Sequence, residues 1–177
     1  AIRCPAGSVV SDSLPMRLPE IARDALFRTA KAALPKQLYP SALLRRRVRR
    51  KTRQVVSGGP FTGMHYLDHS VWGAYIPKLI GCYELELHPY IEQIIDRKPS
   101  HIVDIGGAEG YYAVGLLCRA TTARLTVFEQ LVGARAPIRE LGARNGVDSR
   151  LSIRESCTPQ ALDEVLESGV DAIISDV

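Results

Sequence analysis

Short apolar runs alternate regularly with amphipathic stretches from residue 101 to the end of the sequence. The strand-like runs are HIVDI (101–105), ARLTVFE (123–129), RLSIR (150–154) and DAIISDV (171–177). Between them lie three helix-like stretches, GYYAVGLLCRA (110–120), APIRELGARNG (136–146) and TPQALDEVLESG (158–169). Strands and helices that alternate at this pace form right-handed βαβ units around a parallel sheet covered on both faces. The sequence therefore predicts an α/β fold with a doubly wound parallel sheet.

Two of these helix-like stretches carry end signals. Asn145-Gly146 suits a left-handed C-terminal cap, because glycine adopts positive φ without a steric penalty. Thr158 is a good N-cap residue, and Pro159 fits the first helical position. Both signals support the predicted helix boundaries.

The first 60 residues have a different character. Small and apolar residues recur at helical spacing over 19–34, which predicts an amphipathic helix. A basic connector is expected over 36–60, and seven arginine and lysine residues crowd into Arg45–Arg53. The sequence thus predicts two regions, an α-helical N-terminal extension over 1–60 and a sheet-containing domain over 61–177.

Composition narrows the class of protein. With 46% hydrophobic residues and a formal net charge of +4, the chain reads as a soluble globular protein. It has no apolar run near the roughly 20 residues that a membrane-spanning helix needs, and no signal-peptide layout. The four cysteines are scattered without a C-x-x-C pair, which favours reduced thiols, a cytoplasmic location and no metal site.

The glycine-rich turn Ile105–Gly110 follows the first predicted strand. Ligands of open parallel sheets bind beyond the carboxyl ends of the strands, and glycines let a ligand approach the backbone closely. Glu129 ends the second strand, 19 residues after Gly110. A carboxylate in that position accepts hydrogen bonds from ribose hydroxyls. The turn and the acid together predict a nucleoside-containing ligand.

The pattern of glycines narrows the choice of nucleoside. With Gly106 as the first glycine of G-x-G-x-x-G, Ala108 and Tyr111 occupy the other two positions, so the dinucleotide fingerprint fails. The phosphate-binding pattern G-x-x-x-x-G-K-[ST] is absent. A ligand with a ribose, an amino-acid tail and no phosphate fits better, since Asp104 can meet an ammonium group.

The stretch VDIGGAEGYYAVGLL resembles motif I of class I S-adenosylmethionine-dependent methyltransferases, and LTVFEQ resembles their second-strand acid motif. DAIISDV is similar to their fourth-strand motif, and the combination with YELELHPYIE resembles the FkbM-type branch. The resemblance implies a Rossmann-like methyltransferase core that binds S-adenosylmethionine and transfers a methyl group to a hydroxyl oxygen of a small molecule or glycan. The implied cofactor-binding residues are Asp104, Gly106, Gly107, Ala108, Gly110, Glu129, Ser156 and Asp176, and no catalytic residue is assigned.

Class I methyltransferases have seven strands, whereas this sequence contains strands 1–4 only. The resemblance therefore implies a partial cofactor-binding domain within a longer protein. Departures from the family pattern are few, and the one within motif I is Ala108, which stands where a glycine is common.

Two other functions remain open from the sequence. An NAD(P)-binding oxidoreductase would use the same fold, and a non-catalytic nucleoside- or RNA-binding module would use the basic cluster Arg45–Arg53. No RNA-binding motif supports a nucleic-acid partner, and the cluster also fits a solvated linker or contact with an anionic membrane surface. The oligomeric state is not predicted.

The segment before the first strand carries weaker signals. A helix is expected near Pro89, with four residues turned into the core, Tyr90, Ile91, Ile94 and Ile95. Tyr83 and Glu84 are candidates to close over the donor site, as similar segments of the family do. A set of possible metal ligands, His65, Asp68 and His69, lacks the helical spacing that such a site would have.

Overall fold

A computed structural model describes residues 39–71 and 73–176. The chain divides into two compact units, residues 1–43 and 44–177. The amphipathic helix predicted over 19–34 lies outside the described residues. Everything that bears on the site belongs to the second unit.

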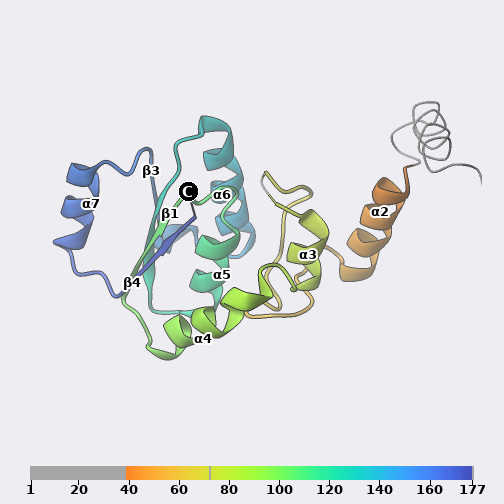
Figure 1. Cartoon of the computed structure of the whole chain (residues 1–177), viewed down its shortest axis with the longest axis horizontal. Coiled ribbons are helices and arrows are strands. Elements are labelled where there is room, and N and C mark those ends of the chain that lie inside the picture. The colour runs from red at the N-terminus through yellow and green to blue at the C-terminus, as the bar shows by residue number, and fades with distance from the viewer. Residues whose placement is uncertain (1–38, 72, 177) are drawn as a thin grey trace, which may run out of the picture. The chain divides into compact units, whose positions relative to one another are not determined.

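Four parallel strands form the sheet, in the order β3-β2-β1-β4 (Figure 1). They are β1 (His101–Ile105), β2 (Arg124–Phe128), β3 (Leu151–Arg154) and β4 (Ala172–Ser175). The chain moves outward from β1 to β3 and then returns to the other side of β1, so the strand order reverses between β1 and β4. This is the doubly wound, Rossmann-like arrangement that the sequence predicts. The carboxyl end of β1 is consequently the switch point at which such sheets bind ligands.

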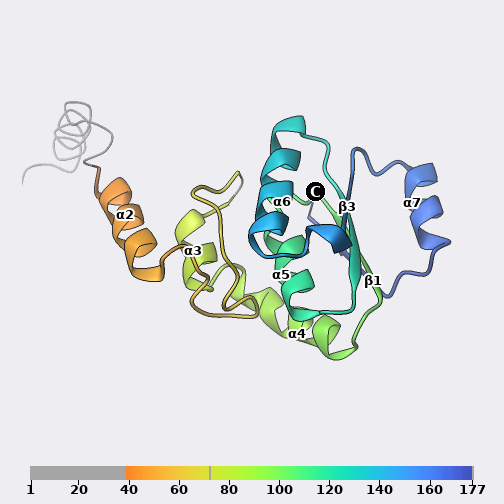
Figure 2. The same cartoon turned by 180° about the vertical axis from the view of Figure 1, so that it is seen from behind.

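Helices cover both faces of the sheet. α5 (Tyr111–Arg119) and α6 (Val132–Arg144) lie on one face, and α7 (Pro159–Leu166) lies on the other (Figures 1 and 2). Because both faces are covered, the central strands are buried almost throughout: the first four residues of β1 and the last four of β2 are buried.

The two predicted helix-end signals are confirmed, although α6 begins at Val132, four residues before the predicted stretch. The Thr158 side chain accepts a hydrogen bond from the Ala161 N–H at 3.2 Å, and Pro159 occupies the first position of α7. Gly146 follows α6 with a φ of +65°, in the left-handed region. These local signals work because caps satisfy backbone groups that a helix cannot pair internally.

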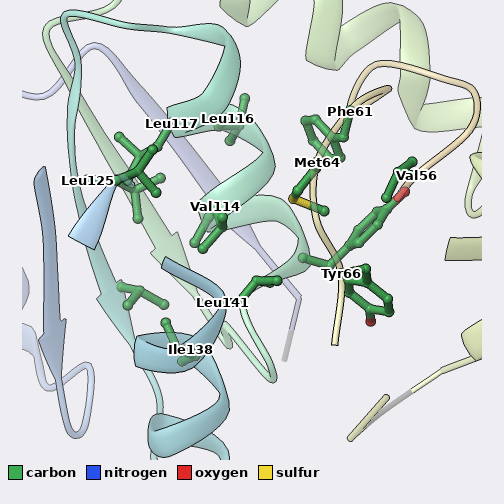
Figure 3. Packing of buried hydrophobic residues seen from close by; sticks show 14 of the residues in the cluster. Val56, Phe61, Met64, Tyr66, Val114, Leu116, Leu117, Leu125, Ile138 and Leu141 are labelled. Carbon is green, nitrogen blue, oxygen red and sulfur yellow. The ribbon is translucent and has the colours of Figure 1, made fainter. Parts of the chain in front are cut away.

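A long loop from Val56 to Leu67 packs over α5 and closes the main core (Figure 3). Phe61 lies directly on Gly115 of α5, where a β-carbon would come within 2.5 Å of the Phe61 ring. Met64 and Tyr66 are buried in the same cluster. The segment upstream of β1 is therefore an integral layer of the second unit.

The helix predicted near Pro89 is α4 (His88–Asp96). Ile91 is buried and Ile94 and Ile95 are partly buried against the core, as expected. The expectation for Tyr90 is wrong, because its side chain is 63% exposed. The three isoleucines form an i, i+3, i+4 stripe, and Tyr90 lies about 100° around the helix from Ile91 and faces solvent.

The basic segment is helical rather than an irregular connector. α2 spans Pro40–Thr52 and contains no acidic residue in its first turn. Within the second unit, the Arg45 guanidinium lies 4.4 Å from the centre of the Tyr75 ring and donates to the Asp68 carbonyl at 2.7 Å. Arg49 lies 3.7 Å from the Asp68 carboxylate. No helix in the described part of the chain is long and apolar enough to cross a membrane.

Candidate functional site

An open crevice of about 470 Å³ lies at the carboxyl ends of the strands. It is large enough for a small-molecule ligand. Each strand contributes to it through its last residue or the residues just after it. The lining consists of Ile105, Gly106, Ala108, Phe128, Glu129, Gln130, Leu131, Glu155, Cys157 and Asp176.

Two residues of the glycine turn face this crevice. Gly106 has a φ of +89°, and its N–H donates to the Phe128 carbonyl at 2.9 Å, which ties the start of the turn to β2. Ala108 has a φ of +47°, in the left-handed region where a residue with a β-carbon is strained by about 1–2 kcal/mol. The turn is therefore held in a conformation that Ala108 would not adopt unaided.

The other two glycines of the turn serve packing. A β-carbon on Gly107 would lie 2.1 Å from the Val127 side chain of β2. Gly110 has a φ of +90° and lies against Ile138 of α6, 3.3 Å from a β-carbon built there. Neither lines the crevice, so the structure assigns Gly107 and Gly110 to close contact between the turn, the sheet and α6.

Glu129 lies at the mouth of the crevice with both carboxylate oxygens anchored. Oε2 accepts the Ala108 N–H at 2.7 Å, and Oε1 accepts the Leu131 N–H at 2.7 Å. The residue is only 6% exposed. A carboxylate has about four acceptor positions, so two remain after these bonds. The Glu129 carboxylate is thus fixed in place and can still accept a hydrogen bond from a ligand hydroxyl.

Asp104, in the fourth position of β1, is buried behind the turn. The backbone N–H of Ala113, in the first turn of α5, interacts with its carboxylate and lowers its pKa, although the N-cap of that helix is Gly110. Its Oδ2 atom is buried and has no hydrogen-bond partner among the described residues. Burial, together with the negative charges of Asp176 and Glu129, raises the pKa of Asp104 to about 7. An unsatisfied buried carboxyl oxygen is costly, and it marks a position where a donor group is missing.

Sequence reasoning missed Glu109, the acid inside the glycine turn. Its side chain is completely buried and, among the described residues, accepts hydrogen bonds from these four groups. The Lys78 ammonium lies 2.5 Å from Oε1, which also accepts from the Tyr66 hydroxyl at 2.5 Å and from the Ser70 hydroxyl at 2.7 Å. Oε2 accepts the Val71 N–H at 3.1 Å. The only sequence signal was a lone lysine within the apolar stretch YIPKLIG.

The pKa values in this cluster follow from its contacts. Burial alone would raise the pKa of Glu109, but the Lys78 charge and the hydrogen bonds lower it below the usual value. Burial and the adjacent Glu109 charge raise the pKa of Tyr66, so its hydroxyl stays protonated and donates. Glu109 is therefore an ionised carboxylate, fully paired inside the protein.

Tyr83 and Glu84 lie near the same edge of the sheet. The Tyr112 hydroxyl donates to the Glu84 carboxylate, which joins this segment to the first turn of α5. The centre of the Tyr83 ring lies 5.8 Å from the ring centre of Tyr111, the first residue of α5 after the glycine turn. Burial raises the pKa of Tyr83, and the hydrogen bond to Glu84 and the charges of Glu84 and Asp176 raise it further. The segment is thus beside the crevice, although neither residue lines it.

The loop after β3 differs in detail from the expectation. Ser156 does not line the crevice, whereas its neighbours Glu155 and Cys157 do. Asp176, the residue after β4, lines the crevice and is solvent-exposed. In the described part of the chain, no group of histidine, cysteine and acidic residues is arranged to hold a metal ion.

Comparisons with known proteins give structural similarities only. No protein-family model and no curated protein sequence matches the chain. Among solved structures, the chain is similar to the methyltransferase PaMTH1 of Podospora anserina in its SAH-bound form, at 20% identity and a TM-score of 0.46, covering 95% of this chain and 62% of that one. An O-methyltransferase from Bacillus cereus in complex with SAH gives 13% identity and a TM-score of 0.46, covering 86% and 60%.

A third similar structure is a putative O-methyltransferase from Klebsiella pneumoniae, at 19% identity and a TM-score of 0.42, covering 86% of this chain and 60% of that one. The chain thus spans about three fifths of the length of these three structures. The fold class itself follows from the parallel strand order and register of the sheet.

Proposed function

We propose that the protein is an S-adenosylmethionine-dependent methyltransferase that acts on a hydroxyl oxygen. The observation that carries this proposal is the charge of the crevice. Among its lining residues three are acids, Glu129, Glu155 and Asp176, and none is a lysine or arginine. The Oδ2 atom of Asp104, which has no hydrogen-bond partner among the described residues, adds a buried acceptor behind the turn. Such a site suits a cationic nucleoside and disfavours a pyrophosphate.

Different lining residues are proposed to contact different parts of the donor. Glu129 is fixed where it can accept from ribose hydroxyls, and Gly106 and Ala108 give the donor's amino-acid tail close access to the backbone. Asp104 supplies an acceptor for the donor's ammonium group, directly or through water. Leu131 and Phe128 offer apolar surface to the nucleoside, and Cys157 lies where the adenine would sit.

The chemistry supplied by the bound donor is an activated methyl group on a sulfonium. The protein's task is to hold donor and acceptor in line and to exclude water, which is worth up to about 7–11 kcal/mol when the geometry is good. Tyr83 and Glu84 are placed to form one wall of the acceptor side. Because the pKa of Tyr83 is raised, its hydroxyl stays neutral and cannot serve as the base.

The finer assignments belong to the same proposal. We propose an FkbM-type enzyme with a small-molecule or glycan acceptor, with Gly107, Gly110 and Ser156 contributing to the donor site from behind the lining. Cys82, Cys118 and Cys157 are free thiols, which fits a cytoplasmic location.

Calorimetry of the purified chain with S-adenosylhomocysteine and with NAD tests the proposal. We expect binding of S-adenosylhomocysteine that Glu129→Ala abolishes and that Glu140→Gln leaves unchanged. Glu140 is a suitable control because it is an exposed carboxylate on α6 that pairs with Arg144. Binding of NAD alone would make the protein an NAD(P)-linked oxidoreductase. Binding of RNA alone, falling steeply with salt, would make it a nucleic-acid-binding module.

A further inference from the structure

The completely buried Glu109 joins two parts of the sequence that are far apart. It belongs to the glycine turn, and its four donors come from the segment between Tyr66 and Lys78. Lys78 itself is 3% exposed and lies 4.7 Å from the centre of the Tyr83 ring. The glycine turn is therefore attached from behind to the layer that precedes β1.

Because Glu109 lies within the turn, its fixed side chain also restricts the backbone of its neighbours. The residues on either side, Ala108 and Gly110, both have left-handed backbone conformations. Ala108 is the strained one, and its N–H is the group that donates to Glu129. With the Glu109 side chain held by four partners, the backbone around it cannot rotate to relieve Ala108. The fixed Glu109 side chain thus keeps the Ala108 N–H directed at the Glu129 carboxylate.

We propose that the Glu109–Lys78 pair is a positioning device for the donor site, acting through Ala108 on Glu129. The inference rests on the proposed function for its ligand. Glu109 and Lys78 act from behind the turn, since neither lines the crevice. They are positioning residues: their removal loosens the Ala108–Glu129 bond and lowers the affinity for the donor nucleoside.

A stabilising role alone would not require this chemistry. Replacing a buried ion pair with well-packed apolar residues is often neutral or stabilising, so burial of Glu109 and Lys78 brings no necessary gain in folding free energy. Directed hydrogen bonds to Glu109 hold the backbone of the turn in one geometry, whereas apolar packing would not fix it in this way. The turn next to Glu129 is where the fold uses that geometry.

The first test compares the affinity for S-adenosylhomocysteine of the wild-type chain, Glu109→Gln and Lys78→Met. We expect both variants to bind about tenfold more weakly at a temperature where all are folded. Leu125→Val is the control, because Leu125 is buried in the second position of β2, away from the end of the strand that lines the crevice, so the change destabilises the fold without touching the turn. Wild-type affinity in Glu109→Gln, or an equal loss in Leu125→Val, would overturn the inference.

The second test asks whether the effect passes through Ala108. Glycine adopts the left-handed conformation without strain. Adding Ala108→Gly to Glu109→Gln should therefore recover part of the lost affinity, whereas no recovery would show that Glu109 acts by another route and would overturn the mechanism.

The third test needs no ligand. Hydrogen exchange should be faster at the Ala108 amide in Glu109→Gln than in wild type, with exchange in β1 and β2 unchanged. Unchanged protection at Ala108 overturns the inference whatever the ligand. Failure of the wild-type chain to bind S-adenosylhomocysteine, with faster exchange in the variant, would overturn the proposed function alone.

Discussion

Two buried carboxylates lie five residues apart in the sequence, one at the end of β1 and one inside the glycine turn, and their surroundings are opposite. Glu109, behind the turn, has four hydrogen-bond donors and a lowered pKa. Asp104, in β1 just before the turn, has one backbone donor, an oxygen without a partner among the described residues, and a pKa raised to about 7. The fold satisfies one acid completely and leaves the other short of a donor.

This difference separates a structural acid from a binding acid. Burying a charge is tolerated when the protein itself supplies the partners, as it does for Glu109. An acid that is buried without them is stable only because it can hold its proton or because a ligand supplies the missing donor. The experiments below therefore change each acid or the residue between them.

The largest effect is expected from breaking the Glu109 pair. Lys78→Met leaves the Glu109 carboxylate buried without its cation, which should lower the free energy of unfolding by about 3–5 kcal/mol. Urea denaturation followed by circular dichroism measures this loss. The double variant Lys78→Met/Glu109→Gln carries no unpaired charge and should recover part of the stability. A loss below 1 kcal/mol in Lys78→Met would mean that Lys78 is not the main partner that stabilises the buried Glu109 carboxylate.

The next effect concerns Asp104 and its pH dependence. Its pKa in the folded protein is raised to about 7 from the ordinary 3.8, so the folded state binds a proton that the unfolded chain has released between these values. The contribution of Asp104 to stability is therefore complete below about pH 3.8 and is lost as the pH rises to about 7, on the order of 4 kcal/mol in all. Above pH 7 it changes no further.

Asp104→Asn isolates this contribution. The asparagine oxygen still accepts the Ala113 N–H, while the titrating group is gone. The stability of wild type relative to this variant, measured by urea denaturation from pH 4 to pH 8, should fall with rising pH. A difference that is flat across this range would show that Asp104 titrates normally and would remove the contrast with Glu109.

A smaller effect is expected on ligand binding. A cationic ammonium beside Asp104 favours the ionised carboxylate, so binding below pH 7 must release a proton. The affinity for S-adenosylhomocysteine should consequently fall by about tenfold from pH 8 to pH 6, and by much less in Asp104→Asn. Calorimetry in two buffers of different ionisation enthalpy counts the proton directly. No proton release at pH 6 would place the ammonium elsewhere.

The same contrast explains what the sequence could reveal. Asp104 and Glu129 could be predicted as parts of one ligand site because each is tied to the end of a strand, and neighbouring parallel strands end at one edge of a sheet. The periodic pattern after residue 101 predicted both the sheet and the strand limits, because alternation and caps are local properties. In contrast, Glu109 and Lys78 are 31 residues apart and belong to no regular pattern, so only the folded chain brings them together.

Packing separates the residues of the glycine turn that line the crevice from those that only contact other parts of the protein, a distinction that the sequence did not predict. Four positions of the turn, Gly106, Gly107, Ala108 and Gly110, were predicted as one binding loop. The structure divides them, since Gly106 and Ala108 line the crevice while Gly107 and Gly110 accommodate Val127 and Ile138. That division depends on which side chains β2 and α6 present, and no rule within the glycine pattern contains that information.

The smallest effect is expected at Ala108, which lies between the two contrasting acids. Ala108→Gly removes a left-handed strain of about 1–2 kcal/mol but adds about 0.4–1 kcal/mol of entropy to the unfolded chain. The net gain in the free energy of unfolding should be about 0.5 kcal/mol, measured by urea denaturation. Ala136→Gly, on an exposed position of α6, is the matched control and should cost about 1 kcal/mol, because its backbone is helical. Equal losses of stability in Ala108→Gly and Ala136→Gly would mean that Ala108 is unstrained. Glu109 would then not be needed to keep the turn in its left-handed conformation.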